Sequence, residues 1–408
     1  MANGSPAAQE RSPLLRPWHF ILAFGIVSLL ADMVYEGARS IIGPYLGTLG
    51  ASATVVGLVA GAGEFIGYGL RVLSGLAVRR TQHYWAWTIT GYALTVLSVP
   101  LIGATGLIAP ALLLYGTERL GKAVRSPAKD TLLSRASTRT GRGSAFGVHQ
   151  ALDQTGAMLG PLLLAAVLAW SEGDYRLAFA VLAVPGVLVL GLLAWLRTRV
   201  PDPAVYEHDG GAPAPARGPD AKGMARAHLP ARFWQYTAAV AVLSCGVAPF
   251  PLMAFHAQST GLLGDALVPV VFAVAMAVDG LSGFVVGRLY DRRGPLVLLA
   301  VPVAAAVAAI SFGGSVALVW TGAAVWGIVN GVLDSTVKAV VTELVPSHSR
   351  AVAFGWLALV RGVGLLAAGG ILGAAYAASP AAAVTVILAA NALAFAGLAL
   401  VLRRLRRA

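Results

Sequence analysis

Charged side chains recur at helical spacing inside some of the most apolar stretches of this sequence. Asp32, Glu36 and Arg39 lie within residues 19–44, and Tyr35 shares their spacing. Intervals of three and four residues place all four side chains on one face of a helix. Two carboxylates one turn apart repel each other in a medium of low polarity, so one of them is expected to hold a proton near neutral pH. The alternative is a static network that fixes helix packing; we favour proton coupling for Asp32, and both interpretations stay open for Glu36 and Arg39.

Other apolar stretches carry similar sets of ionisable and polar side chains. They are Glu64, Tyr68 and Arg71 in residues 53–78; Glu118, Arg119, Lys122, Arg125 and Lys129 around residues 107–128; His149, Gln150, Asp153 and Gln154 in residues 144–170; Asp279 in residues 264–288; Asn330, Asp334 and Lys338 in residues 315–341; and Arg361 in residues 351–376. Glu64 and Asp153 join Asp32 and Glu36 as candidate proton-coupling residues. The structural alternatives are buried ion pairs, such as Glu64 with Arg71 or Asp334 with Lys338, and interfacial positions for Arg125 and Lys129. For Asp279 we favour a structural role.

The composition indicates a membrane protein. The chain is 57% hydrophobic and 12% charged, whereas a soluble globular protein carries about 25% charged residues. Because a bilayer requires about 20 apolar residues per helix, and because spanning segments of this length are helical, we predict an all-α membrane protein. Its twelve predicted transmembrane helices cover residues 19–44, 53–78, 84–104, 107–128, 144–170, 176–196, 232–257, 264–288, 295–313, 315–341, 351–376 and 380–402.

Charge is distributed unevenly among these spans and loops. The third, sixth, ninth and twelfth spans carry no charge at membrane depth, so we expect them to face lipid. Basic residues concentrate in alternate loops, for example Arg79 with Arg80 and Arg292 with Arg293, and in the segments after residues 196 and 402. By the positive-inside rule both termini are cytoplasmic. The net charge of +12 therefore reflects membrane topology, and no nucleic-acid partner is expected.

The chain divides into two halves with an internal repeat. Residues 199–230 are rich in Pro, Gly and charge and predict a flexible cytoplasmic linker between residues 1–198 and residues 231–408. Three pairs of positions match in order: Gly75 with Gly287 (offset 212), Gly121 with Gly331 (offset 210), and Phe146 with Phe354 (offset 208). Nearly constant offsets indicate an internal duplication, as in many secondary transporters.

Two motifs resemble those of the major facilitator superfamily, and the resemblance covers the whole chain. Residues Gly287, Asp291, Arg292 and Gly294 are similar to the signature G-x-x-x-D-R-x-G between spans eight and nine. Residues Gly147, Gly156, Gly160 and Pro161 are similar to the span-five pattern G-x8-G-x3-G-P of the family's proton antiporters. The copy of the first signature between spans two and three lacks its Asp (Gly75 to Arg80), so the bacterial subgroup and its substrates stay unassigned.

The resemblance implies the position of several side chains. Spans one and four of each half would line a central cavity, with Tyr35, Arg39, Tyr68, Glu118, Arg119, Lys122, Asn330, Asp334, Lys338 and Arg361 as candidate substrate contacts. Asp291 and Arg292 would form a cytoplasmic latch. The glycines of span five would pack on span eight, where Ala275, Asp279, Gly283 and Gly287 form another series.

Prolines indicate where helices are interrupted. Pro249 and Pro251 are expected to break the seventh span, and Pro44 lies at the corresponding position of the first span with an offset of 205. Breaks near the outer ends of both spans predict a periplasmic gate.

These patterns together predict a proton-coupled antiporter that exports a small organic solute or drug by alternating access. The alternatives are proton-coupled uptake and a non-transporting receptor. An enzyme is not expected, because H-E-x-x-H, G-x-S-x-G and G-x-x-x-x-G-K-[ST] motifs are absent from the sequence. We expect no cofactor, no metal ion, a monomer in the bacterial inner membrane, and a single packing cysteine, Cys245.

Overall fold

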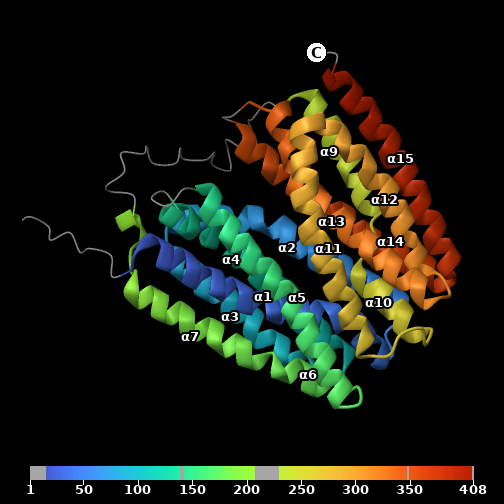
Figure 1. Ribbon diagram of the computed structural model, residues 1–408, viewed down its shortest axis with the longest axis horizontal. Coiled ribbons are helices and arrows are strands. Elements are labelled where there is room, and N and C mark those ends of the chain that lie inside the picture. The colour runs from blue at the N-terminus through green and yellow to red at the C-terminus, as the bar shows by residue number, and fades with distance from the viewer. Residues whose placement is uncertain (1–14, 138–141, 207–228, 347–348, 407–408) are drawn as a thin grey trace, which may run out of the picture.

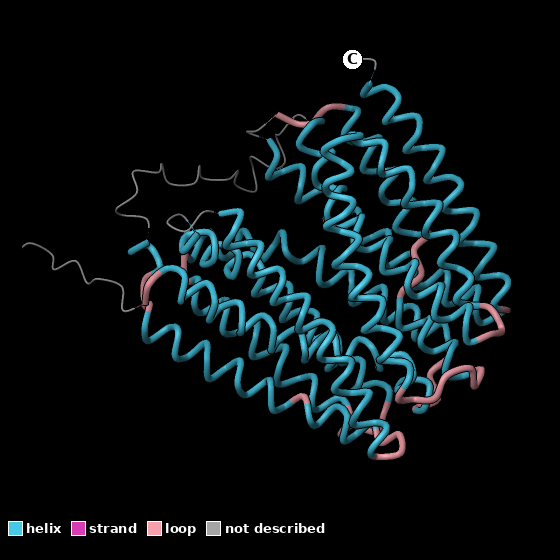
Figure 2. The backbone as a smooth tube through the Cα atoms, viewed as in Figure 1, coloured by secondary structure: helices cyan, strands magenta, loops and turns pink. Residues whose placement is uncertain are grey.

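Every regular element of the computed structural model is helical within its described residues, which are 15–137, 142–206, 229–346 and 349–406 (Figures 1 and 2). The first half contains α1 (Pro17–Thr48), α2 (Ala53–Thr81), α3 (Tyr84–Ile102), α4 (Ile108–Ala136), α5 (Arg142–Trp170), α6 (Tyr175–Val181) and α7 (Ala183–Arg199). The second half contains α9 (Ala231–Cys245), α10 (Phe250–Ser259), α11 (Leu267–Arg293), α12 (Ala300–Ala308), α13 (Val316–Leu344), α14 (Arg350–Ala378) and α15 (Pro380–Arg406). Short 3-10 turns cover Pro203–Tyr206, Gly294–Leu299 and Ala309–Phe312. The prediction of an all-helical fold is therefore confirmed for this part of the chain.

Ten segments of the described chain are long and apolar enough to cross a membrane. The number differs from the twelve predicted spans for two reasons. Helix α4 is 29 residues long but carries several charged side chains, and the segment Leu267–Phe312 runs through 46 residues that include two of the predicted spans. Gly294, whose φ of 67° is left-handed, ends α11 and turns the chain between those two.

The two halves repeat the same packing pattern. Helix α1 packs on α5 as α9 packs on α14, and α2 packs on α4 as α11 packs on α13. Figure 1 shows the halves as two groups of helices, α1–α7 and α9–α15, that diverge toward the end of the molecule where α15 finishes. We call the opposite end, with the α1–α2, α5–α6 and α10–α11 loops, the distal end.

Contact between the halves is concentrated toward the distal end. The most extensive pairing is between α2 and α14, where Gly57 and Gly61 face Gly369 and Gly373 backbone to backbone. A methyl group at Gly61 would lie 2.6 Å from the carbonyl oxygen of Leu365, so the approach depends on glycine.

Two further contacts join the halves at this end. The Tyr175 hydroxyl donates a 2.7 Å hydrogen bond to the Asp265 carboxylate across the boundary. A methyl group at Gly43 of α1 would overlap the backbone of Pro251 in α10. The distal end is therefore closed by close backbone contacts and at least one hydrogen bond.

The prediction that the span-five glycines pack on span eight is wrong. A methyl group at Gly156 or Gly160 would overlap the backbone of Leu29 or Met33 in α1, and Gly147 has no heavy atom within 4 Å of its added Cβ position. The series of α11 likewise faces its own half, since Gly327 and Gly331 of α13 pack against it. Helical spacing identified both small-residue faces, but the adjacent helix belongs to the same half in each case. Pro161 lies inside α5, which continues to Trp170.

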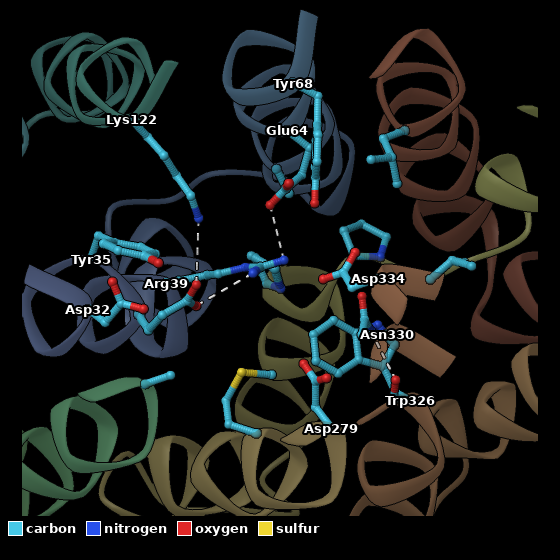
Figure 3. Close-up of a pocket in the computed structure, with 18 of the residues that line it drawn as sticks. Asp32, Tyr35, Arg39, Glu64, Tyr68, Lys122, Asp279, Trp326, Asn330 and Asp334 are labelled. Atoms are coloured by element: carbon cyan, nitrogen blue, oxygen red, sulfur yellow. Dashed lines mark hydrogen bonds and ion pairs between the residues drawn. The ribbon is translucent and has the colours of Figure 1, made fainter. Parts of the chain in front are cut away.

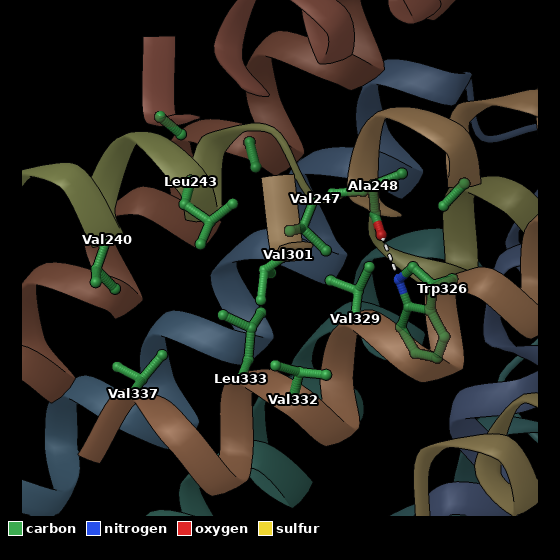
Figure 4. Close-up of a cluster of buried hydrophobic side chains, with 14 of the residues drawn as sticks. Val240, Leu243, Val247, Ala248, Val301, Trp326, Val329, Val332, Leu333 and Val337 are labelled. Atoms are coloured by element: carbon green, nitrogen blue, oxygen red, sulfur yellow. Dashed lines mark hydrogen bonds between the residues drawn. The ribbon is translucent and has the colours of Figure 1, made fainter. Parts of the chain in front are cut away.

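The predicted proline breaks differ between the halves. The seventh span is interrupted at residues 246–249, between α9 and α10, whereas α1 continues through Pro44 to Thr48. In the buried cluster beside the break, the Trp326 indole N–H donates a 2.8 Å hydrogen bond to the Ala248 carbonyl (Figure 4). That bond satisfies a carbonyl that the interrupted helix leaves open. Only one of the two predicted gate positions is therefore a break.

Part of the predicted flexible linker is ordered. Tyr206 is fully buried, and its hydroxyl donates a 3.0 Å hydrogen bond to the Leu15 carbonyl. The rest of the predicted linker, residues 207–228, lies outside the described residues.

The spans without charge have outward apolar faces. Large exposed apolar side chains include Leu97 and Leu101 of α3, Val184 and Val187 of α7, Val303 of α12, and Leu393 and Leu400 of α15. Such faces suit contact with lipid tails.

Candidate functional site

A cavity with an empty volume of about 1110 Å³ lies where the halves meet (Figure 3). Its walls come from α1, α2, α4 and α5 of the first half and from the α9–α10 break, α11, α13 and α14 of the second. Six carboxyl side chains line it (Asp32, Glu36, Glu64, Asp153, Asp279 and Asp334), with three cationic ones (Arg39, Lys122 and Arg361). Sequence analysis singled out all nine of these residues, and it favoured a structural role for Asp279.

The first half holds a chain of alternating charges across the cavity. Lys122 lies 3.8 Å from Glu36, and Arg39 lies 3.5 Å from Glu36 and 3.0 Å from Glu64. Figure 3 shows the Arg39 side chain extending toward Glu64. Residues 36 and 39 are one turn apart on α1, and α2 and α4 supply the other members. Arg39 is thus the residue that connects the charges of α1 with those of α2.

Glu118 and Arg119 lie behind this wall. Both side chains are 1% exposed and form an ion pair with each other, and Arg119 also lies 3.6 Å from Glu64. The Arg119 guanidinium stacks on Tyr115 at 5.3 Å and on Tyr35 at 5.7 Å. Neither residue lines the cavity. Both were predicted to contact the substrate, but they lie behind the cavity wall and contact the residues that form it.

Asp153 of α5 joins a second polar cluster. Its carboxylate lies 4.0 Å from Lys129 and 4.0 Å from the buried His149. His149 also hydrogen-bonds to Ser28 of α1 at 2.9 Å. At the next residue of α5 after Asp153, the Gln154 amide donates a 2.5 Å hydrogen bond to the Met276 carbonyl of α11, which links the two halves at the cavity wall.

The second half contributes fewer charges. Arg361 lies 3.1 Å from Asp334 and stacks on Tyr68 at 5.0 Å. This pair across α13 and α14 forms in place of the local Asp334–Lys338 pair, since Lys338 is exposed and lies outside the cavity lining. The Asn330 amide donates a 2.9 Å hydrogen bond to the Trp326 carbonyl.

Two of the six lining carboxyl groups form no ion pair with any described residue: Asp32 and Asp279. Asp32 is 6% exposed and lies beside Tyr35 on α1 (Figure 3). Asp279 is half-buried on α11, near Asn330 and Trp326. Burying a carboxylate without a counter-charge is costly, so each of these groups favours either a proton or a bound cation.

The signature residues after span eight form no ion pair with the described residues of this structure. Asp291, Arg292 and Arg293 are exposed, and no ion pair joins any of them to a described residue. The neighbouring Tyr290 hydroxyl donates a 2.6 Å hydrogen bond to Glu343 of α13. The predicted latch is therefore not engaged while the halves diverge at this end.

Sequence reasoning missed several features of the site. Trp326 and Met276 line the cavity but resemble ordinary apolar residues of their spans. The α2–α14 contact was also missed, although Gly57 with Gly61 and Gly369 with Gly373 are G-x-x-x-G pairs, a known signal for close helix contact in membranes. Among the described residues, His, Cys, Asp and Glu side chains form no group of three or more that would hold a metal ion.

Comparisons with known proteins agree with this architecture. A family model described as Major Facilitator Superfamily matches residues 25–369. An uncharacterized protein of Mycobacterium tuberculosis is 45% identical over 392 residues, which is 95% of each chain. An uncharacterized MFS-type transporter of Methanocaldococcus jannaschii is 27% identical over 184 residues, 45% of this chain and 46% of that one.

Solved structures share the fold at low sequence identity. The nucleoside transporter NupG superposes with a TM-score of 0.75 at 12% identity, covering 94% of this chain and 99% of that chain. A bacterial homolog of the human lysosomal transporter Spinster, inward-facing and occupied, superposes with a TM-score of 0.69 at 16% identity, covering 95% and 97%. At these identities the likeness shows a shared fold. With a family model matching most of its length, this chain belongs to the Major Facilitator Superfamily.

Proposed function

We propose that the protein is a proton-coupled antiporter that exports a small organic solute across the bacterial cytoplasmic membrane by alternating access. The observation that carries the proposal is Asp32: a buried carboxyl group in the cavity shared by both halves, without an ion-pair partner among the described residues. Such a group gains or loses a proton when its surroundings change. A change of access from one side of the membrane to the other is a change of this kind.

The arrangement of the halves supports alternating access. The halves are joined at the distal end by the α2–α14 glycines and by Tyr175 with Asp265. Basic residues such as Arg79, Arg197 and Arg292 lie at the opposite end, which the positive-inside rule assigns to the cytoplasm. In this assignment the cavity is reached from the cytoplasm, and rocking of the halves would expose it to the other side.

The membrane potential drives this exchange when each cycle moves one more positive charge inward than outward. One elementary charge that crosses 100 mV gains about 2.3 kcal/mol, which corresponds to a solute gradient of well over tenfold. Asp32 would carry the proton inward after the solute has left. The neighbouring pairs of Glu36 with Lys122 and of Glu64 with Arg39 balance the charges beside it.

The test is a proton-flux assay in everted membrane vesicles with a pH-sensitive dye and a panel of organic compounds. A transported compound should dissipate an inside-acid gradient with the wild-type protein. Asp32→Asn should abolish that dissipation, because an amide cannot release a proton, while the protein remains folded. Asp32→Glu should retain part of it.

The control is Asp130→Asn, which removes an exposed carboxyl group of α4 outside the cavity lining and should leave dissipation unchanged. Full coupling in the Asp32→Asn variant would remove Asp32 from the mechanism. Compound accumulation that requires a proton gradient of the same direction as solute movement would replace export by uptake. Binding without any flux would indicate a receptor.

A further inference from the structure

The carboxylates around the cavity can be paired one to one with cations until two carboxyl groups remain. Five carboxylates each have a cation within 4.0 Å: Glu36 with Lys122, Glu64 with Arg39, Glu118 with Arg119, Asp153 with Lys129, and Asp334 with Arg361. Asp32 on α1 and Asp279 on α11 remain, one in each half. Two more arginines lie nearby, Arg71 over Tyr68 at 5.1 Å and Arg125 over Tyr92 at 4.4 Å, but neither lines the cavity.

Asp279 differs from Asp32 in its surroundings. Asp32 is 6% exposed and lies within the first-half wall, whereas Asp279 is only half-buried and Figure 3 shows its carboxyl group directed into the cavity. Charged groups reach the same space from two other elements, Glu36 and Arg39 on α1 and Asp334 on α13. Of these, Arg39, Glu36 and Asp334 are already engaged in ion pairs.

The wall beside Asp279 is suited to a positively charged group. The Arg39 guanidinium lies 5.9 Å from the centre of the Trp326 ring, which lines the cavity, and an aromatic ring of this kind attracts a cation. The Asn330 side-chain nitrogen donates to the Trp326 carbonyl. Its side-chain oxygen accepts no hydrogen bond from the described residues and can accept one from an N–H donor. Gln154 of α5 closes this side of the cavity.

From this arrangement we infer that the transported solute is an organic cation, most simply an amine in its ammonium form, and that Asp279 receives its charge with Asn330 and Trp326 beside it. The inference rests on the proposed function and adds the substrate class to it. An ammonium group would supply the counter-charge that Asp279 lacks. An organic anion would meet six lining carboxyl groups against three cations and leave Asp279 uncompensated.

Binding of probe pairs with matched shape and opposite charge tests this inference. The probes are tetraphenylphosphonium with tetraphenylborate, and tryptamine with indole-3-propionate, titrated by calorimetry into the purified full-length protein. At least one cation should bind, and its anionic counterpart should not. Asp279→Asn should weaken cation binding by at least about tenfold, Asp279→Glu should restore most of it, and Asp130→Asn should leave it unchanged.

Several outcomes would overturn the inference. They are binding of the anions, failure of both cations to bind, and cation affinity that Asp279→Asn leaves intact. If the Asp279→Asn protein elutes as an aggregate in size-exclusion chromatography, the Asp279→Glu protein serves as the test. Cation binding by that variant supports the inference, and loss of cation binding in a folded Asp279→Glu protein overturns it. The assay needs no proton gradient, so cation binding without flux would overturn the proposed antiport and keep the assignment of Asp279. Proton-coupled transport of an anion would support the proposed antiport and overturn the assignment of Asp279.

Discussion

The two halves line one cavity with different chemistry. The first half supplies six charged side chains (Asp32, Glu36, Arg39, Glu64, Lys122 and Asp153), most of them tied to neighbours by ion pairs. The second half supplies three (Asp279, Asp334 and Arg361), together with Trp326 and the interrupted helix at residues 246–249. Because helices pack in the same pattern in both halves, the difference lies in side chains rather than in architecture.

This difference suggests a division of work between the halves. A dense and nearly neutral network keeps its members in place, because removing one charge weakens the compensation of each neighbouring charge. A sparse wall with one uncompensated carboxyl group can exchange partners. This contrast supports both proposals, in which the proton binds in the first half and the solute in the second.

Arg39→Ala is expected to have the largest effect. Arg39 lies 3.5 Å from the buried Glu36 and 3.0 Å from the half-buried Glu64. Its loss leaves Glu36 with Lys122 at 3.8 Å and Glu64 with Arg119 at 3.6 Å. Breaking a buried ion pair from one side costs about 3–5 kcal/mol. We expect a marked drop in the thermal unfolding temperature and loss of transport. A milder loss for Arg39→Lys would support the charge argument; equal stability of Arg39→Ala and wild type would show that the network is not mutually dependent.

Gly369→Leu should disturb the contact between the halves without changing any charge. Overpacking costs about 1–3 kcal/mol, enough to change the ratio of distal-closed to distal-open molecules by about 5- to 150-fold. Spin labels at Thr105 and Ser379, in a Cys245→Ser background, should report longer distances by pulsed EPR. Gly370→Leu is the matched control, because only the side chain of Leu58 lies near it, at 3.7 Å. Unchanged distances in Gly369→Leu would argue against a gate at this contact.

Arg361→Gln should sharpen the contrast between the halves. It removes the 3.1 Å partner of Asp334 and makes the second half more acidic. A nearby charge is worth about 1 kcal/mol at 4 Å in a water-like medium, so cation affinity should rise by about fivefold. Arg71→Gln is the control, because Arg71 also stacks on Tyr68, at 5.1 Å. Weaker cation binding in Arg361→Gln would mean that Arg361 helps to hold the solute.

Lys338→Ala should have the smallest effect. Lys338 is exposed and lies outside the cavity lining, and such surface changes stay within about 0.5 kcal/mol. Transport and unfolding temperature should match the wild type. By contrast, Lys122→Ala on the corresponding helix of the first half removes the 3.8 Å partner of Glu36 and should impair transport. Equal losses in both variants would refute the asymmetry.

Much of this fold follows from the sequence. Apolar runs of about 20 residues located the helices, and spacing placed Asp32, Tyr35, Glu36 and Arg39 along one cavity-lining face of α1. Both signals are local, since hydropathy and helical period depend on a few turns of chain. The break in the seventh span was likewise predicted from a local signal, the prolines at positions 249 and 251.

Relations between helices were harder to predict. The face that carries Gly156 and Gly160 was identified, but its partner is α1 and not α11. Asp334 pairs with Arg361 across helices rather than with Lys338 along its own. Helical period fixes which residues share a face, but the rotation of the helix decides what that face meets, and that depends on packing of the whole bundle.

The break in the seventh span has a consequence for how the molecule would move. Helix α9 packs on α14 and α15 of its own half, whereas α10 packs mainly on α1 and α2 of the other, with Phe255 3.0 Å from the Cβ position at Gly47. Side chains of α10 such as Phe250, Met253 and Ala257 also belong to the buried cluster of the second half, so α10 contacts both halves. If the halves separate at the distal end, α10 either loses its contact with α1 or moves together with it. In the second case the chain would bend at residues 246–249, between α9 and α10.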